Sequence, residues 1–508
     1  MAIFTGTGGD DSINGTSGND DFHLEQGGQD HAYGGAGLDV FYMGATFDTA
    51  DTIDGGSNND FIVLDGDYSA GVAFHSNTMI SIEGIEVTAG HSYSFTGMTT
   101  ANIGATFQVD GSALGTFDSL DYDASGVSGR GITMLGGAGA DSLVGGDAGD
   151  SIVGGAGSDY LRGNEGNDTI TGGDGADTLG GGRGNDYFSF GSGVNSINGG
   201  EGNDTMVASS SMDSHDVIDG GTGFDYLYLQ GGTYNLSAEN VTGVEVIHFS
   251  GAAEVKAQTT LISGGQTLYV SIDNGGALDF NGKKEVDSLY NITGADQADH
   301  IVGGHQGDYI LGAAGDDLLT GGAGNDTLIA GGGTDTLLGG AGNDLLSADS
   351  GAVTINGGDG DDVINAFSHV AGSSILAKDG NDTINLNFSD QTITGGGGAD
   401  AINAAEGFSY QYNYLKATDS TLDGMDTISH LSASDVINLS KIDADVGTSG
   451  NQAFHVVSEF SGSAGELVLV YDHLRDLTTI EGDVNGDGVA DLAIVTAGDQ
   501  TGYDNFVL

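Results

Sequence analysis

The 508-residue sequence contains no cysteine, no proline and no tryptophan. Without cysteine, a disulfide framework and thiol catalysis are both excluded for these residues. No run of eighteen apolar residues occurs, so the sequence predicts no membrane-spanning helix and no membrane insertion. The opening MAIFTGTGGDD has neither a basic region nor an apolar core, so we expect no cleavable N-terminal signal peptide.

Basic residues are also scarce, with 10 Lys and Arg against 74 Asp and Glu and a formal net charge of −64. This balance excludes nucleic acid and anionic membranes as direct partners. Most of the aspartates lie inside a repeated phrase, so we expect their charge to be neutralised by metal ions. Without metal, charge repulsion and the conformational entropy of 95 glycines should keep the chain largely unfolded.

The repeated phrase is clearest in residues 303–347, which read GGHQGDYIL, GAAGDDLLT, GGAGNDTLI, AGGGTDTLL and GGAGNDLLS. An aspartate recurs every nine residues, and a large apolar residue follows two positions later, which gives the form G-G-x-G-x-D-x-U-x. The glycines suit a tight turn and expose backbone carbonyls, and the last three residues suit a short strand with one inward side chain. A single unit cannot bury that side chain, so the units must stack into a solenoid.

The same phrase forms an earlier block, and adding 158 to the numbers of its aspartates from Asp141 to Asp204 gives an aspartate in the later block each time. Glycine-poor segments precede both blocks and resemble each other, so the sequence contains a duplicated unit of about 158 residues. We interpret the glycine-poor segments as longer-stranded rungs of the same solenoid, with separate sandwich domains as the alternative.

The in-phase nonapeptides resemble those of the RTX (repeats-in-toxin) family of calcium-binding secreted proteins. The resemblance implies an all-β fold, an elongated right-handed parallel β-roll or β-helix solenoid, with several Ca²⁺ ions held in GGxGxD turns by carboxylates and backbone carbonyls. Ca²⁺ is a hard cation that takes six to eight oxygen ligands at flexible geometry, which such turns can supply. The candidate metal ligands in the regular blocks are Asp141, Asp150, Asp159, Asp168, Asp177, Asp186, Asp204, Asp225, Asp299, Asp308, Asp317, Asp326, Asp335, Asp344, Asp362, Asp382 and Asp400, with the glycines Gly137, Gly139, Gly155, Gly157, Gly173, Gly175, Gly322, Gly324, Gly340, Gly342, Gly358 and Gly360. A less regular N-terminal copy adds Asp11, Asp20, Asp30, Asp39 and Asp60.

The last hundred residues resemble the C-terminal domain of serralysin-type secreted proteins. In that family this region carries an uncleaved signal for a type I ABC exporter, and here Asp504 followed by Phe506, Val507 and Leu508 matches the terminal pattern. We therefore predict six segments: a degenerate RTX β-roll at 1–60, glycine-poor rungs at 61–134, an RTX block at 135–225, glycine-poor rungs at 226–293, an RTX block at 294–405, and the serralysin-like domain at 406–508.

Catalytic motifs are weak. The HExxH motif of serralysin proteases is missing, so only the calcium-binding and export parts of that resemblance carry over. GHSYS at 90–94 is the nearest approach to a nucleophile elbow but lacks its closing glycine, and a structural strand explains it better. Asp483, Asn485, Asp487 and Asp491 resemble the first part of an EF-hand loop, and a β-turn explains the same residues equally well.

These observations predict a secreted, non-enzymatic, calcium-binding structural protein, such as an S-layer or extracellular-matrix component. The expected partners are the chain itself in a calcium-dependent oligomer or lattice and a type I exporter during secretion, with cell-surface polysaccharide as a further candidate. A polysaccharide-active β-helix enzyme, such as a lyase or epimerase, and a monomeric RTX adhesin are the alternatives. The expected location is extracellular, including the cell surface.

Overall fold

The structure is a computed structural model that describes residues 1–99, 103–209, 212, 214–257, 265–367 and 372–508. The chain divides into two compact units, the first formed by residues 1–230 and 237–248 and the second by residues 231–236 and 249–508. The only helix among the described residues is a single 3₁₀ turn, η1 (Ala417–Asp419), and every other element is a strand. No described helix therefore has the length or apolar character needed to cross a membrane.

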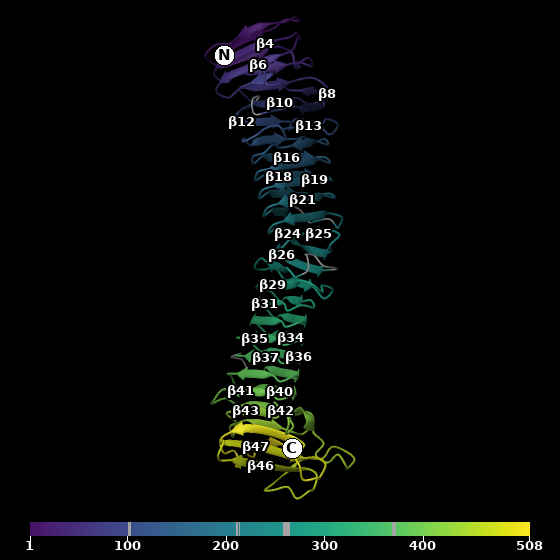
Figure 1. Ribbon diagram of the computed structural model, residues 1–508, viewed down its shortest axis with the longest axis vertical. Coiled ribbons are helices and arrows are strands. Elements are labelled where there is room, and N and C mark those ends of the chain that lie inside the picture. Colours follow the sequence, from purple (N-terminus) through teal and green to yellow (C-terminus); the bar gives the residue numbers. More distant parts are fainter. Residues whose placement is uncertain (100–102, 210–211, 213, 258–264, 368–371) are drawn as a thin grey trace. The chain divides into compact units, whose positions relative to one another are not determined.

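In the first unit, parallel strands stack one above another (Figure 1). One column contains β1 (Ala2–Thr5), β3 (Asp20–His23), β5 (Val40–Met43), β7 (Phe61–Leu64), β10 (Ile82–Val87), β12 (Ile103–Asp110), β14 (Ile132–Leu135), β16 (Ser151–Ala156), β18 (Thr169–Asp174), β20 (Tyr187–Phe190), β22 (Thr205–Ala208) and the start of β24 (Tyr226–Leu236). A second sheet contains β2 (Ser12–Asn14), β4 (His31–Ala36), β6 (Thr52–Ser57) and β9 (Met79–Ile80). A third contains β8 (Tyr68–Ala73), β11 (Tyr93–Thr96), β13 (Leu120–Asp123), β15 (Ser142–Val144), β17 (Tyr160–Glu165), β19 (Thr178–Arg183), β21 (Ser196–Glu201), β23 (Val217–Thr222) and β25 (Val241–Thr242).

The second unit repeats this arrangement with two parallel columns (Figure 1). One runs from the end of β26 (Val246–Ala257) through β28 (Leu278–Asn281), β30 (His300–Val302), β32 (Leu318–Ala323), β34 (Asp335–Ala341), β36 (Val353–Asp359), β38 (Ser374–Asp379), β40 (Gln391–Gly397) and β42 (Tyr410–Asn413) to β44 (Val436–Asn438). The other runs through β27 (Thr267–Ile272), β29 (Leu289–Thr293), β31 (Tyr309–Ala314), β33 (Thr327–Gly332), β35 (Leu345–Ala348), β37 (Val363–Ala366), β39 (Thr383–Leu386) and β41 (Ala401–Ala404) to β43 (Asp426–Ser429). Two nonapeptides make one coil, so paired residues are 18 apart in the regular blocks, and the predicted all-β parallel solenoid class is confirmed.

The large apolar residue of each nonapeptide points inward and stacks on its counterpart in the next coil. In the first unit Ile152 pairs with Ile170, which pairs with Phe188, and all three are fully buried. In the second unit Leu328 pairs with Leu346 in the same way, and both are buried. The period of nine therefore places one apolar side chain per strand in a narrow core.

The glycine-poor segments use longer coils and larger core residues. Tyr93, Phe95 and Tyr122 are at most 1% exposed, and Tyr93 pairs with Leu120 in the neighbouring strand. In segment 61–134 the strands pair in parallel with those of the flanking repeats, from β5–β7 to β14–β16. The segments at 61–134 and 226–293 include residues 100–102 and 258–264, which lie outside the described residues. The six boundaries predicted from composition stay predictions.

At the C-terminal end of the second unit the strand direction changes (Figure 1, yellow). The strands β46 (Glu466–Asp472), β47 (Leu477–Asp483) and β48 (Leu492–Ala497) pair antiparallel, and β45 (His455–Val457) pairs with β46. The last parallel strands, β43 and β44, pair with β48 and with β49 (Phe506–Val507). Both columns of the second unit are thus covered at this end by the chain's own final strands.

Candidate calcium sites

Each repeat aspartate from Asp20 onward uses one carboxylate oxygen to hold the coil before it. The Asp159 Oδ1 accepts a hydrogen bond of 2.8 Å from the backbone N–H of Asp141, 18 residues earlier. In the second unit Asp326 Oδ1 accepts the N–H of Asp308 at 2.7 Å. The four aspartates are at most 3% exposed, so the carboxylates form a buried ladder along the turns.

The second oxygen of most of these carboxylates is buried and has no hydrogen-bond partner. A buried polar atom without a partner is unfavourable, and a buried anion without one more so, which points to a cation as the partner of these oxygens. The residues whose Oδ2 atom is buried and unpartnered are Asp39, Asp60, Asp159, Asp168, Asp177, Asp186, Asp204, Asp225, Asp317, Asp326, Asp335, Asp344, Asp362, Asp382, Asp400 and Asp426.

In turns that carry the full glycine phrase, three glycines leave room for this oxygen and for the backbone carbonyls. In the turn that ends at Asp159, a Cβ on Gly154 would strike the Asp159 carboxylate. A Cβ on Gly155 would strike the Gly137 carbonyl of the coil before, and one on Gly157 the Gly139 carbonyl. Gly155 and Gly157 also have φ values of +113° and +124°, which side chains disfavour. Carbonyl and carboxylate oxygens therefore crowd the space between stacked turns.

Asn195 indicates which groups surround the Oδ2 atom of a ladder aspartate. It occupies an aspartate position, and its Oδ1 accepts the Asp177 N–H at 3.1 Å, as a ladder aspartate would. Its Nδ2 donates to the carbonyls of Gly191 and Gly193 in its own turn, each at 3.3 Å. An aspartate at the equivalent position carries Oδ2 in place of this donor, so the turn then lacks the N–H group that bridges its two carbonyls. A cation is the group that fits such a set of oxygens.

The donor set fits Ca²⁺. Among the described residues, no group of three or more His, Cys, Asp or Glu side chains could hold a metal by itself, so backbone carbonyls must supply part of the shell. Ca²⁺ accepts mixed carbonyl and carboxylate oxygens in numbers that flexible turns can provide. When bound, calcium would supply the positive charge that the buried carboxylates lack.

Burial also shifts the acidity of the ladder. Desolvation raises the pKa values of Asp168 and Asp326 to about 7, and backbone hydrogen bonds offset only part of that effect. Nearby ladder carboxylates raise both values further. Without metal these carboxyl groups hold protons well above their ordinary range, and a bound cation would displace those protons.

The predicted glycines at repeat positions two and four lie in the turns, next to the carbonyls of adjacent coils. The predicted aspartates do not all behave alike. In Asp141, Asp150, Asp299 and Asp308, as in Asp11 and Asp20, a backbone N–H of the same turn occupies Oδ2. Asp30 lies in the ladder, with its Oδ1 bonded to the N–H of Asp11.

Sequence reasoning missed several ladder members, because they lie outside the glycine phrase. Glu83 accepts the N–H of Asp60, and Glu245 accepts the N–H of Asp225, each at 2.8 Å. Asp426 accepts the N–H of Asp400 at 3.0 Å, is fully buried, and has a pKa raised by burial to about 8. Each lies at or next to the start of a strand, and no fixed spacing marks it in the sequence.

The EF-hand-like residues form a turn between the antiparallel strands β47 and β48. Asp483 accepts the N–H groups of Gly486 at 2.6 Å and Gly488 at 2.8 Å through its two carboxylate oxygens. Asp491 accepts the Val484 N–H at 2.9 Å, and Asp487 and Asn485 accept other N–H groups of the same turn. Hydrogen bonds thus account for these side chains, and a calcium ion here stays a prediction.

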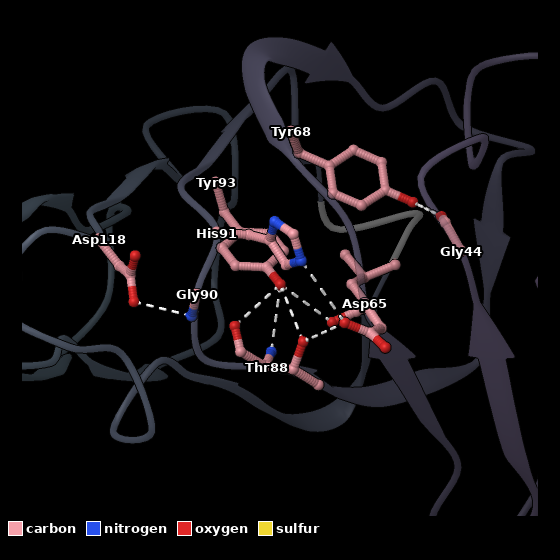
Figure 2. Close-up of polar contacts among 9 residues, drawn as sticks. Gly44, Asp65, Tyr68, Thr88, Gly90, His91, Tyr93 and Asp118 are labelled. Atoms are coloured by element: carbon pink, nitrogen blue, oxygen red, sulfur yellow. Dashed lines mark hydrogen bonds and ion pairs between the residues drawn. The ribbon is translucent and has the colours of Figure 1, made fainter.

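Residues 90–94, the GHSYS phrase, lead into β11 beside a network of polar contacts (Figure 2). The Tyr93 hydroxyl accepts the Thr88 N–H at 3.2 Å and donates to the Thr88 carbonyl at 3.0 Å. The Thr88 hydroxyl donates to Asp65 at 2.8 Å, and His91 Nε2 lies 3.8 Å from the same carboxylate. In the phrase itself, Ser92 accepts the Ser119 N–H at 3.1 Å. These contacts close turns of the glycine-poor segment.

Stacked glycine turns with a buried carboxylate ladder define a calcium-binding parallel β-solenoid. The sequence matches the family profile of the RTX calcium-binding nonapeptide repeat over residues 3–50, 133–188, 191–233, 291–366 and 376–409, just over half of the chain. The protein therefore belongs to the RTX nonapeptide-repeat family, and the predicted calcium cofactor is confirmed at the level of that family.

Among solved structures, the chain is similar to the solution structure of the AlgE6R3 subunit from the Azotobacter vinelandii mannuronan C5-epimerase. The two share 21% identity over 42% of this chain and 80% of that one, with a TM-score of 0.14. At that score the likeness carries no argument about activity. A search of curated proteins finds no match.

Proposed function

We propose that this protein is a secreted, non-enzymatic structural protein that folds in extracellular calcium and assembles with copies of itself into an S-layer, matrix or filament. The observation that carries the proposal is the series of buried, unpartnered Oδ2 atoms in both units. Extracellular calcium sites typically bind at about 10⁻⁴–10⁻³ M. Folding coupled to many such sites would therefore proceed outside the cell and stay incomplete in the cytosol.

Secretion is supported by the C-terminal region and by the same calcium dependence. The terminal residues Phe506 and Val507 carry the pattern that resembles an exporter signal, and in the folded chain they pair with Ile437 and Asn438. A type I exporter would have to read them before that pairing forms. An unfolded chain at low cytosolic calcium would keep them accessible.

Self-assembly is supported by the strands at the other end of the chain. Among the described strands, β1 pairs only with β3 and β2 only with β4, so each has a free edge. Their inward residues Phe4 and Ile13 are only half-buried, and Ile3 is 68% exposed. Free strand edges and exposed apolar side chains favour docking onto a second molecule. A head-to-tail contact of this kind propagates into a filament or sheet.

The test is multi-angle light scattering and negative-stain microscopy at high protein concentration, with and without millimolar calcium. We expect calcium-dependent oligomers that Ile3→Lys weakens, because charge on an edge strand opposes edge pairing. Val217→Lys is the matched control, since it adds the same charge at an apolar residue that is 45% exposed on β23, which is paired on both sides. Removal of residues 1–22 should weaken assembly as well.

A strict monomer in calcium would reject the structural-polymer proposal and favour a monomeric adhesin or a polysaccharide-active enzyme. Oligomers weakened equally by both lysine variants would instead reject the N-terminal edge as the contact. The monomer would then be incubated with cell-surface polysaccharide. An adhesin would bind the polymer and leave it unchanged, whereas an enzyme would alter the polymer chain.

A further inference from the structure

In the second RTX block, residues 135–225, the turns of the first coil are closed by hydrogen bonds without a cation. In the turn that ends at Asp141, the backbone N–H of Gly137 donates to Oδ2 at 2.6 Å. In the next turn the N–H of Gly146 donates to Asp150 Oδ2 at 2.7 Å. These are the oxygens that stay unpartnered in later coils such as that of Asp159.

The third RTX block, residues 294–405, begins in the same way, 158 residues later. Ala295 donates to Asp299 Oδ2 at 2.8 Å and Gly304 donates to Asp308 Oδ2 at 2.6 Å. The N-terminal block also begins with closed turns, in which Thr7 donates to Asp11 and Thr16 donates to Asp20. The closed turn therefore marks the first coil of every block, whatever its local residues.

Backbone conformation changes together with this hydrogen bond. At the fourth repeat position, Gly157 and Gly315 of later coils have φ values of +124° and +126°. Gly139, in a first coil, does not adopt a positive φ, although it too is glycine. Two other first-coil turns carry Gln297 and Gln306 at this position, residues that rarely adopt such values. The carbonyls of first-coil turns are therefore oriented differently from those of later turns.

We propose that the first coils at 136–150 and 294–308, and the turn closed by Asn195, bind no calcium through their own side chains. In the first coils an N–H donor occupies the oxygen that a cation would need. In the Asn195 turn, the Nδ2 donor already bridges two carbonyls. A cation would have to break these bonds and approach N–H groups that repel it. In these two blocks the calcium series therefore starts at the second coil, and in the earlier of them it is interrupted at Asn195.

This inference rests on calcium binding by the family and assigns which turns take part. It also explains how a block can begin next to a coil that lacks the nonapeptide turn. Leu278, in the glycine-poor coil before this block, donates to Asp299 Oδ1 at 2.6 Å, as a residue of a nonapeptide coil would. The closed turn thus forms a junction with the glycine-poor coil through hydrogen bonds alone.

The experiment counts calcium bound per full-length chain by equilibrium dialysis and atomic emission at saturating calcium. The double variant Asp299→Asn with Asp308→Asn should keep the wild-type count. The matched pair Asp317→Asn with Asp326→Asn, in the next coil, should lower the count by at least one. Asn195→Asp should raise it by one, because that change recreates an unpartnered oxygen facing Gly191 and Gly193.

The β-sheet circular dichroism of each variant in calcium establishes that the count refers to folded protein. An equal loss of calcium from the two double variants, or no gain from Asn195→Asp, would overturn the assignment. If the double variant Asp299→Asn with Asp308→Asn fails to fold, the Asn195→Asp variant still tests the assignment. That change adds a carboxylate and keeps the oxygen that accepts the hydrogen bond from Asp177. None of these counts depends on secretion or assembly, so the proposed function can fail while the assignment stands.

Discussion

The nonapeptide blocks and the glycine-poor segment at 61–134 both consist of stacked coils, but different interactions hold the coils together. In the blocks each strand buries one large apolar residue, joined in some strands by a second one, and most turns bury a carboxylate whose second oxygen lacks a partner. In the glycine-poor segment the core is wider, with Tyr93, Phe95 and Tyr122 buried, and the turns are closed by side-chain hydrogen bonds (Figure 2). From this difference we expect the fold of the blocks to depend on a cation and that of the segment on apolar burial.

Calcium removal should separate the two kinds of region most strongly. We expect a chelator at neutral pH to unfold the nonapeptide blocks, because their buried carboxylates then lack a counter-charge. Amides of the glycine-poor segment, such as that of Phe95, should retain more protection from hydrogen exchange than those of Leu328. Exchange measured by mass spectrometry on peptides from both regions checks this. Equal protection with and without calcium throughout the blocks would contradict the comparison.

Loss of register should be the next largest effect. Deletion of Gly324 shifts Leu328 and the inward residues after it relative to the coils below, so it should abolish the cooperative calcium-bound fold of the third block. Asp326→Ala removes one ladder carboxylate and leaves the phase intact, so it should lower the melting temperature only by several degrees. Thermal melts in calcium compare them. If both variants melt alike, stacking in phase is not what holds the block.

A pH change should act on the metal-free blocks in a defined direction. Burial raises the pKa values of Asp159 and Asp382 to about 7, whereas an unfolded aspartate titrates near 3.9. The folded state therefore binds more protons than the unfolded state between about pH 4 and pH 7, so its stability is greatest at the acid end and falls as pH rises. Calcium affinity should rise over the same interval, because the ion displaces these protons.

Circular dichroism in buffer stripped of calcium on a chelating resin should thus show more β structure at pH 4.5 than at pH 7.5. Surface repulsion has the same sign, so the comparison is repeated in added salt, which screens exposed charges far more than buried ones. If added salt removes the pH effect entirely, the effect arises from exposed surface charges and not from the buried carboxylate ladder.

The smallest effect should come from a single turn of the glycine-poor segment. Tyr93→Phe keeps the buried ring and removes the hydroxyl that bridges to Thr88, so we expect a loss of about 1 kcal/mol. The loss should be the same in saturating and in limiting calcium if this turn is metal-independent. Urea unfolding followed by hydrogen exchange in peptides around Thr88 measures it. A loss that grows as calcium falls would show that the two regions are coupled.

Much of the block structure was predictable, because the period of nine alone places residues such as Leu328 in the core and Asp326 in the turn. The glycine positions followed for the same reason. The distinction between Asp299 and Asp317 was not predictable from local sequence, because it depends on which coil lies before each turn. Glu245 and Asp426 were missed because the chain reaches the ladder there through irregular loops, which leave no fixed spacing to detect.

The backward reach of the carboxylates has an evolutionary consequence. Asp141 accepts the N–H of Leu120, and the bond between Asp299 and Leu278 repeats that contact 158 residues later. A copied segment therefore carries the aspartate carboxylates that accept hydrogen bonds from the preceding strand. The donor in that strand is a backbone N–H group, which every residue except proline provides. Tandem duplication can therefore lengthen such a gene without inventing a new interface, and the complete absence of proline keeps every position eligible as a point of insertion.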